Sequence, residues 1–263
     1  MTRKSGCLLS ATALVLAGVA GYALPAAGLA PPRPAAPDDY FNAGNTAYDG
    51  RFVFVRLRYE MGLRAARFLR GDLPWAHDYP RAERNLSRIL GEVTSLNPFL
   101  GPNGGNVLML DDPELHKFPF AYMSEPGYWT LNEDEARGLR TWLQKGGFLL
   151  FDDFRGDHWF NFEQQLRRVL PDAELVELDI SHPVFHSFFD IDTLEMFEMY
   201  GLPVRFYGVY EDNDPRRRLM IVANYNNDIG EYWEFSDTGW YPIDLTNDSY
   251  QFGVNYVIYA LTH

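Results

Sequence analysis

The chain has 263 residues, of which 46% are hydrophobic and 16% aromatic, so it can bury a sizeable core and is not a disordered protein. Its 36 acidic residues outnumber the 23 basic ones, which gives a formal charge of −13 at pH 7. Such a surface repels nucleic acid and anionic lipid headgroups, so we set aside a nucleic-acid-binding function. Binding of cations or basic partners remains open, as does a role of the charge in solubility alone.

The first 30 residues have the pattern of an export signal. Arg3 and Lys4 precede an apolar stretch of 17 residues, 8–24, and small residues follow it. This pattern predicts a cleaved signal peptide or an uncleaved membrane anchor, because the stretch lies at the lower limit for spanning a bilayer. We therefore expect an exported, periplasmic or cell-envelope protein, soluble or tethered through residues 8–24. Without residues 1–30 the chain keeps 21 basic and 36 acidic residues, a charge of −15.

The rest of the chain divides into a linker and a folded part. Residues 31–49 begin with a proline-rich segment, which predicts an extended linker, and residues 50–263 are expected to form a single α/β domain. Cys7 is the only cysteine and lies before the apolar stretch. The exported part therefore has no disulfide, no cysteine metal ligand and no cysteine nucleophile.

From residue 51 onwards, strand patterns alternate with helix patterns. Runs of β-branched and aromatic residues predict strands, and apolar residues spaced by three and four predict helices. The expected strands are 51–60, 106–110, 120–123, 148–151, 173–178, 204–210 and 218–224; the expected helices are 81–96, 130–145, 158–171 and 249–263, with a short helical or turn segment at 182–189. This alternation predicts an α/β fold, an open, doubly wound, mostly parallel sheet with helices on both faces.

Several segments carry a resemblance to a known family: NLSRILGEVTSLN, DDPELHKFPFAYM, LNEDEARGLRTWLQKGGFLLFDDF, HPVFHSFFDI, RLMIVANYNNDIGEYWE and GVNYVIYALTH. Over about residues 50–263 the chain resembles the bacterial domain of unknown function 4159 family. That family is similar to the class I glutamine amidotransferase-like superfamily, which implies a flavodoxin-like sheet and, often, an envelope association. In active amidotransferases a cysteine on a tight elbow after a central strand is paired with a histidine. Here Asp152 and Asp153 follow that strand, and the exported chain has no cysteine, so cysteine-dependent glutaminase chemistry is excluded.

Acidic residues follow two predicted strands and are candidates for acid–base chemistry. Asp152 and Asp153 follow the run GGFLLF, and Asp112 follows the strand at 106–110. Consecutive strand residues point to opposite faces, so Asp152 and Asp153 converge only if the backbone turns between them, whereas Asp112 can meet either one from a neighbouring strand. Such a pair raises one pKa, as a general acid requires, and His158 is a further acid–base candidate. Alternatively these acids cap helices or contact only water, and His158 lies in the first turn of the next helix.

A second group of residues could bind a metal. His182 and His186 share one side of a helix if the segment is helical, and Asp179 precedes them, so two imidazoles and a carboxylate are available. The apolar residues between and after the histidines instead favour docking on the core. We therefore predict no metal and no cofactor.

The stretch 225–241 is rich in aromatic and amide side chains. Such residues recognise sugars by stacking and planar hydrogen bonds, so it contains four candidate ligand-binding residues, Asn226, Asn227, Asp228 and Trp233. The alternative is a tight turn with Trp233 packed inside.

These observations predict an exported, acidic, non-catalytic module that binds a protein partner or a small polar ligand or assists assembly in the cell envelope. The alternative is a hydrolase acting on a sugar or another small envelope compound through Asp112, Asp152, Asp153 and His158.

Overall fold

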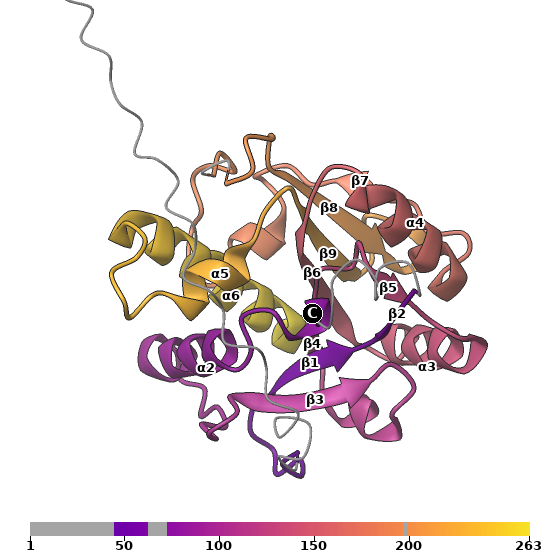
Figure 1. Ribbon diagram of the computed structural model, residues 1–263, viewed down its shortest axis with the longest axis horizontal. Helices are drawn as coiled ribbons and strands as arrows, with labels where there is room; N and C mark the ends of the chain where they lie inside the picture. The colour runs from indigo at the N-terminus through magenta and orange to yellow at the C-terminus, as the bar shows by residue number, and fades with distance from the viewer. Residues whose placement is uncertain (1–44, 63–72, 197–198) are drawn as a thin grey trace, which may run out of the picture. The chain divides into compact units, whose positions relative to one another are not determined.

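A sheet of seven strands organises the part of the chain described by this computed structural model, residues 45–62, 73–196 and 199–263 (Figure 1). In spatial order the strands are β3 (Gly105–Met109), β1 (Phe54–Arg58), β4 (Phe120–Ser124), β6 (Phe148–Phe154), β9 (Leu219–Tyr225), β8 (Arg205–Tyr210) and β7 (Val176–Glu177). The first five run parallel, whereas β8 is antiparallel to β9 and β7 to β8. The predicted leader and residues 31–44 of the predicted linker lie outside the described residues.

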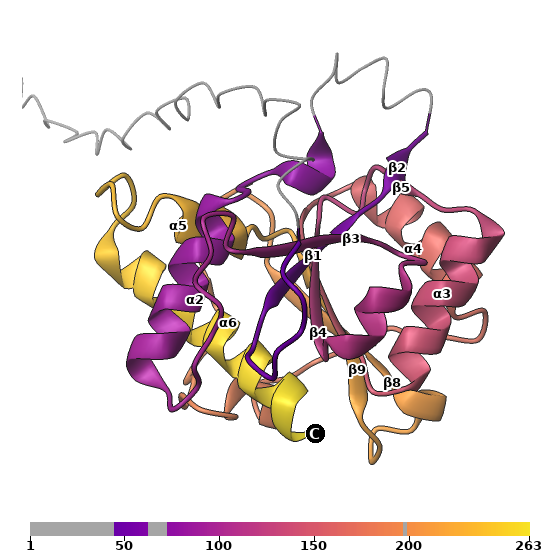
Figure 2. The same ribbon diagram turned by 90° about the horizontal axis from the view of Figure 1, so that it is seen from below.

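Helices cover both faces of the sheet (Figure 2). One face carries α2 (Arg81–Val93), α5 (Ile229–Glu234) and α6 (Ile243–Thr262), and the other carries α3 (Glu133–Gln144) and α4 (His158–Val169). The smaller elements are the paired strands β2 (Glu60–Met61) and β5 (Trp129–Thr130) and the 3-10 turns η2 (Pro74–Ala76), η3 (Pro113–Lys117), η4 (Pro183–Phe185) and η5 (Glu211–Asn213). The predicted open, mostly parallel α/β sheet is therefore confirmed. In the described part of the chain, no helix is long and apolar enough to cross a membrane.

Side chains of each central strand alternate between two cores, one on each face of the sheet. In β4, Phe120 and Tyr122 pack against the α2, α5 and α6 side, while Ala121 and Met123 pack against α3 and α4. Alternation with burial on both faces explains why these strands appear as continuous apolar runs in the sequence.

Two segments differ from the sequence-based expectation. The strand expected at 173–178 contains only the two residues of β7, both exposed at the border of the sheet. The stretch after β9 forms the short helix α5, because Asp228 caps its start by accepting from the Glu231 backbone N–H at 2.9 Å.

The opposite border of the sheet is covered by side-chain amides. The Asn45 amide donates to the Val107 carbonyl at 2.8 Å and accepts from the Val107 N–H at 2.9 Å, as a neighbouring strand would. Asn106 forms a similar pair with the backbone of Thr46, at 3.0 and 2.8 Å. The segment at 45–46 therefore closes the outer side of β3.

A buried ion pair joins β1 to α2. The Arg56 guanidinium is fully buried, donates to the Glu83 carboxylate and to the Trp75 carbonyl at 3.0 Å, and lies 4.7 Å from the Tyr122 ring centroid. Because Trp75 is part of η2, this guanidinium also fixes the segment that leads into His77 and Asp78.

We expect Glu83→Ala to lower the free energy of unfolding by about 3–5 kcal/mol, because it leaves a buried guanidinium without its carboxylate. Replacing both partners, Arg56→Met with Glu83→Leu, should restore most of the loss. Urea denaturation measures both changes. Glu92→Ala, at an exposed position of α2, is the matched control and should change stability by no more than about 0.5 kcal/mol. A loss for Glu83→Ala no larger than this control would contradict the assignment.

Candidate functional site

The carboxyl ends of the parallel strands meet at a topological switch point. The chain passes from β1 through α2 to β3 on one side, and from β4 through α3 to β6 on the other. The switch therefore lies between β1 and β4, where open α/β sheets bind their ligands.

Five ionisable side chains from four segments gather at this edge, and we call them the switch-point cluster: His77 and Asp78 after η2, Glu125 after β4, Asp153 at the end of β6, and Asp228 after β9. Ligand atoms of His77, Glu125 and Asp153 lie within 4.8 Å of one another, and so do those of Asp78, Asp153 and Asp228. Asp153 belongs to both groups. The four carboxylate residues are buried, with exposed fractions of 2–7%.

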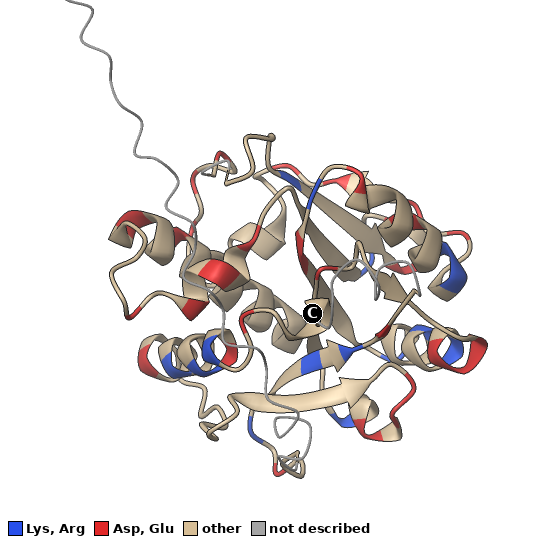
Figure 3. Ribbon diagram, viewed as in Figure 1, with Lys and Arg blue, Asp and Glu red and all other residues tan. Residues whose placement is uncertain are grey.

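The imidazole of His77 lies between two of these acids. Its Nδ1 is 3.3 Å from Glu125 Oε2 and 3.5 Å from Asp153 Oδ2. A third grouping within 4.8 Å, formed by Asp78 with Glu231 and Glu234, extends the acidic region onto α5 (Figure 3).

The backbone is in the left-handed region at three cluster residues. The φ angles are +65° at Asp78, +47° at Glu125 and +56° at Asp153. Side chains other than glycine rarely adopt this conformation, and such residues concentrate at functional sites. At Asp153 the left-handed backbone coincides with a register shift in the pairing of β6 with β9, between Phe151 and Phe154. Both phenylalanines pack on the α3 and α4 side, although residues three apart in a regular strand point to opposite faces. The strand therefore contains one extra residue, and the backbone turns between the two aspartates.

This turn gives Asp152 and Asp153 different surroundings. Asp152 accepts from the Tyr122 hydroxyl at 3.1 Å, the Asn224 amide at 3.1 Å and the Gly230 N–H at 3.0 Å, all inside the α2, α5 and α6 layer. Burial raises the pKa of Asp152 to about 6, although these hydrogen bonds oppose the rise. Asp152 is thus a structural residue that holds the start of α5, whereas Asp153 faces the cluster.

Two tyrosines lie against the cluster. The Tyr59 hydroxyl is 2.7 Å from the Glu125 carbonyl oxygen, and the Tyr200 hydroxyl is 3.0 Å from Asp153 Oδ1 and 3.2 Å from Asp228 Oδ2. A hydroxyl has one proton, so Tyr200 can donate to only one of these carboxylates. Burial, followed by the charges of Asp153 and Asp78, raises the pKa of Asp228 well above its ordinary value. A raised pKa at Asp228 favours the protonated carboxyl, which could itself donate in the second contact.

The other acid–base candidates from the sequence lie in different surroundings. Asp112 caps η3 by accepting from the Glu114 N–H at 2.8 Å, and it belongs to none of the three groupings of the described residues. His158 begins α4 and packs against the Tyr128 ring at a centroid distance of 4.7 Å. Burial and the charge of Arg155 lower the pKa of His158, while Asp153 opposes this. His158 thus lies in the first turn of α4 against Tyr128 and outside the three groupings of the described residues, and Asp112 serves as a helix cap.

The candidates in 225–241 also separate. Asn226 accepts from the Gly156 N–H at 3.0 Å and donates to the Pro203 carbonyl at 2.8 Å, and Asn227 is fully buried. Trp233 is fully buried, and its Nε1 donates to the Ser249 carbonyl at 3.0 Å. Trp233 thus has no exposed face on which a sugar could stack, because it forms the core between α5 and α6. Asp228 alone of this group belongs to the switch-point cluster.

The weak metal candidates make local hydrogen bonds. His182 Nδ1 accepts from the Val184 N–H at 3.1 Å, Asp179 accepts from the Ser181 N–H at 2.8 Å, and His186 Nε2 lies 2.6 Å from the Ile180 carbonyl oxygen. None of them belongs to a grouping of metal-ligating atoms in the described residues.

Sequence reasoning missed His77, Asp78 and Glu125. Glu125 comes directly after β4, and Asp152 and Asp153 lie at the end of β6. The reasoning that singled out Asp152 and Asp153 as acids at a strand end therefore applies to Glu125 as well. His77 and Asp78 lie in a segment without helix or strand periodicity, and the sequence contains no pattern that would place them at the switch point.

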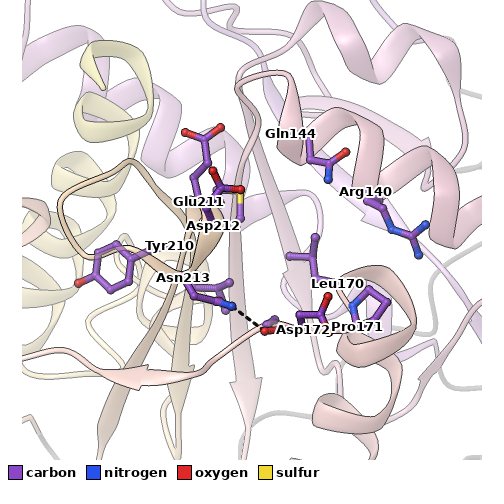
Figure 4. Close-up of a pocket in the computed structure, with 12 residues that line it drawn as sticks. Arg140, Gln144, Leu170, Pro171, Asp172, Tyr210, Glu211, Asp212 and Asn213 are labelled. Atoms are coloured by element: carbon purple, nitrogen blue, oxygen red, sulfur yellow. Dashed lines mark hydrogen bonds between the residues drawn. The ribbon is translucent and has the colours of Figure 1, made fainter.

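A separate hollow of about 210 Å³ lies at the amino ends of the parallel strands (Figure 4). Asn213 closes one side by donating to the Asp172 carbonyl at 2.7 Å, and the Arg140 guanidinium donates to the carbonyls of Val169 and Arg168. Among the described residues that line the hollow, Arg140 carries the only guanidinium, and it is already bound to helix-end carbonyls.

The strand order and the acidic cluster define an open-sheet α/β protein with a candidate ligand site at its switch point. Residues 53–261 match the family described as Domain of unknown function (DUF4159), so the chain belongs to that family. No curated protein matched the chain.

The raised pKa of Asp152 predicts how the stability of the fold changes with pH. Its pKa in the folded protein, about 6, exceeds the ordinary value of 3.8, so the folded state binds more protons than the unfolded state between these pH values. The Asp152 contribution to stability therefore falls as pH rises through this window, by about 2 kcal/mol between about pH 4 and about pH 6. We expect Asp152→Asn to lose this part of the pH dependence in urea denaturation with a chelator present. Identical slopes for the two proteins would contradict the assignment.

Proposed function

We propose that this domain is a non-catalytic binding module whose switch-point cluster takes a divalent cation. The observation that carries the proposal is that Asp78, Asp153 and Asp228 come from three segments, are buried, and bring their oxygens within 4.8 Å of one another. Burying carboxylates together is costly unless protons or positive charge balance them.

The ligand atoms indicate the class of cation. Asp78, Asp153 and Asp228 offer only oxygen, which suits Ca²⁺, Mg²⁺ and Mn²⁺, whereas the group with Glu125 adds the His77 imidazole, which suits Zn²⁺ and other transition metals. Mn²⁺ is compatible with both groups. Binding displaces the proton favoured on Asp228, so affinity is expected to rise with pH.

The placement of the acid–base candidates favours binding over hydrolysis. Asp152 uses both carboxylate oxygens to accept from groups in the core, and Asp112 is committed to the cap of η3. Cys7, the single cysteine of the chain, precedes the apolar stretch, so the folded part has no thiol nucleophile.

We also propose a kinship with the class I glutamine amidotransferase-like superfamily. The strand order has the flavodoxin-like pattern. The strand at one edge of the sheet, β3, is the second of the sheet's strands along the chain, and β1 lies beside it. Asp153 has a left-handed backbone at the end of β6. In the proposed kinship it corresponds to the cysteine that an amidotransferase carries on its elbow. In this proposal an acidic ligand site replaces the nucleophile on the same strand end.

The proposed location is the cell envelope. Its support is the sequence pattern of Arg3 and Lys4 before the apolar stretch 8–24, together with the acidic charge of the remaining chain.

To test the cation site, Mg²⁺, Ca²⁺, Mn²⁺ and Zn²⁺ are each titrated into the chelator-treated full chain by calorimetry and in thermal unfolding. We expect at least one to bind and to raise Tm, with about 2.7 kcal/mol of stabilisation at 100 times Kd. Asp153→Asn, which removes the carboxylate shared by both groups, should weaken binding at least tenfold.

Asp112→Asn is the matched control, since this aspartate also follows a strand but caps η3. It should leave binding unchanged. Asp228→Asn retains a capping side chain for α5 and gives a second variant if Asp153→Asn is unstable. The proposal fails if none of the four ions binds, or if Asp112→Asn weakens binding as much as the cluster variants do.

Export is tested by fractionating bacterial cells that express the full chain. We expect the protein in the periplasmic or membrane fraction, and we expect Leu14→Arg with Leu16→Arg to retain it in the cytoplasm, because the charges interrupt the apolar stretch. Ala35→Arg with Ala36→Arg, in the predicted linker, adds the same charge and should not block export. Equal distribution of the two double variants would contradict the proposal.

A further inference from the structure

A groove of about 640 Å³ lies beside β7, on the antiparallel side of the sheet. One wall is formed by residues 177–180, which continue from β7, and the other by residues 192–195. The start of β8, residues 204–206, also lines it. The volume is within the range of sites that hold several side chains or a small ligand.

The groove combines an apolar lining with an acidic rim. Leu178 and Phe206 are buried, and Ile180, Leu194 and Val204 are half-buried. Four exposed carboxylates lie among them, Glu177, Asp179, Asp192 and Glu195. Figure 3 shows acidic segments around β7.

The groove contains little positive charge to balance these acids. Its single guanidinium, Arg205, bonds the Glu177 carboxylate at 2.6 Å, which leaves Asp179, Asp192 and Glu195 without a basic partner among the lining residues. Asp179 accepts from Ser181, so Asp192 and Glu195 are the carboxylates best placed to meet a ligand.

The groove is distinct from the switch-point cluster. It borders β7 and β8, whereas the cluster lies at the ends of β4, β6 and β9, and the two share no residue. A ligand in the groove therefore does not depend on the proposed cation site.

We propose that this groove docks a basic segment of a partner protein, in which an apolar side chain is flanked by lysines or arginines. The apolar side chain would cover the half-buried Ile180, Leu194 and Val204, and the basic side chains would pair with Asp192 and Glu195. Charge complementarity selects this occupant: nucleic acid is repelled, and a second copy of this chain carries a charge of −13 at pH 7. A free inorganic cation would leave the apolar lining exposed.

The test uses the full chain and three dye-labelled peptides of equal length, measured by fluorescence anisotropy at about 0.15 M salt. The first peptide alternates lysine and leucine, the second replaces leucine by serine, and the third replaces lysine by glutamate. We expect the first to bind and the other two to bind at least tenfold more weakly, because each lacks one half of the complementarity.

Asp192→Asn with Glu195→Gln should weaken binding of the lysine–leucine peptide at least tenfold. The matched control, Glu92→Gln with Asp111→Asn, removes the same charge at exposed positions on α2 and after β3. All four positions are exposed, so both double variants should keep the Tm of the unmodified protein.

Each remaining outcome overturns the proposal. Equal losses for the two double variants would show attraction to overall charge alone, and equal binding of the serine peptide would show that the apolar lining plays no part. The absence of binding by the lysine–leucine peptide would exclude a basic occupant. Chelator treatment should leave peptide binding unchanged, so failure of the cation proposal is distinguished from failure of this one.

Discussion

The burial of four carboxylates at one strand edge is the constraint on which the architecture depends. Asp78, Glu125, Asp153 and Asp228 come from separate segments. Oxygens of Asp78, Asp153 and Asp228 lie within 4.8 Å of one another, and Asp153 also lies within 4.8 Å of Glu125. Two uncompensated like charges that close repel strongly where water is excluded. Protons or positive charge relieve such repulsion, which is the physical basis of the cation site proposed above.

The extra residue in β6 places Asp152 and Asp153 in different surroundings. In a regular strand, Asp152 would point into the core on one face of the sheet and Asp153 into the core on the other. The turn at Asp153 instead leaves Asp152 in the layer of α2, α5 and α6 and directs Asp153 to the cluster. Asp152 also accepts a hydrogen bond from the N–H of Gly230, which lies two residues after Asp228. The same strand end therefore fixes the start of α5 and positions two acids of the site. The Arg56 guanidinium has a comparable role beneath η2, where it binds the Trp75 carbonyl.

Much of the fold could be predicted from the sequence because the central strands are buried on both faces and the helices have one apolar stripe. The site was predicted only in part. Asp153 was identified because it follows an apolar strand, and Asp228 because it lies in the aromatic and amide stretch 225–241. Asp112 follows a strand too, but Pro113 begins a 3-10 turn that uses the Asp112 carboxylate as a cap. The sequence left the burial of Trp233 open, because a tryptophan near asparagines has the same sequence pattern whether it lies on the surface or in the core. His77 reaches the cluster only through tertiary packing of an aperiodic segment, which no local pattern encodes.

Both borders of the sheet prevent further strands from joining. On one border the Asn45 amide pairs with the backbone of Val107 in β3, and the Asn106 amide of β3 pairs with the backbone of Thr46. On the other border β7 contributes only two residues, one of them charged. Long, flat, unpaired borders are the usual starting points for growth into fibrils. In the described part of the chain, the two borders therefore offer few backbone groups for a further strand, and contacts with other molecules fall on side-chain surfaces.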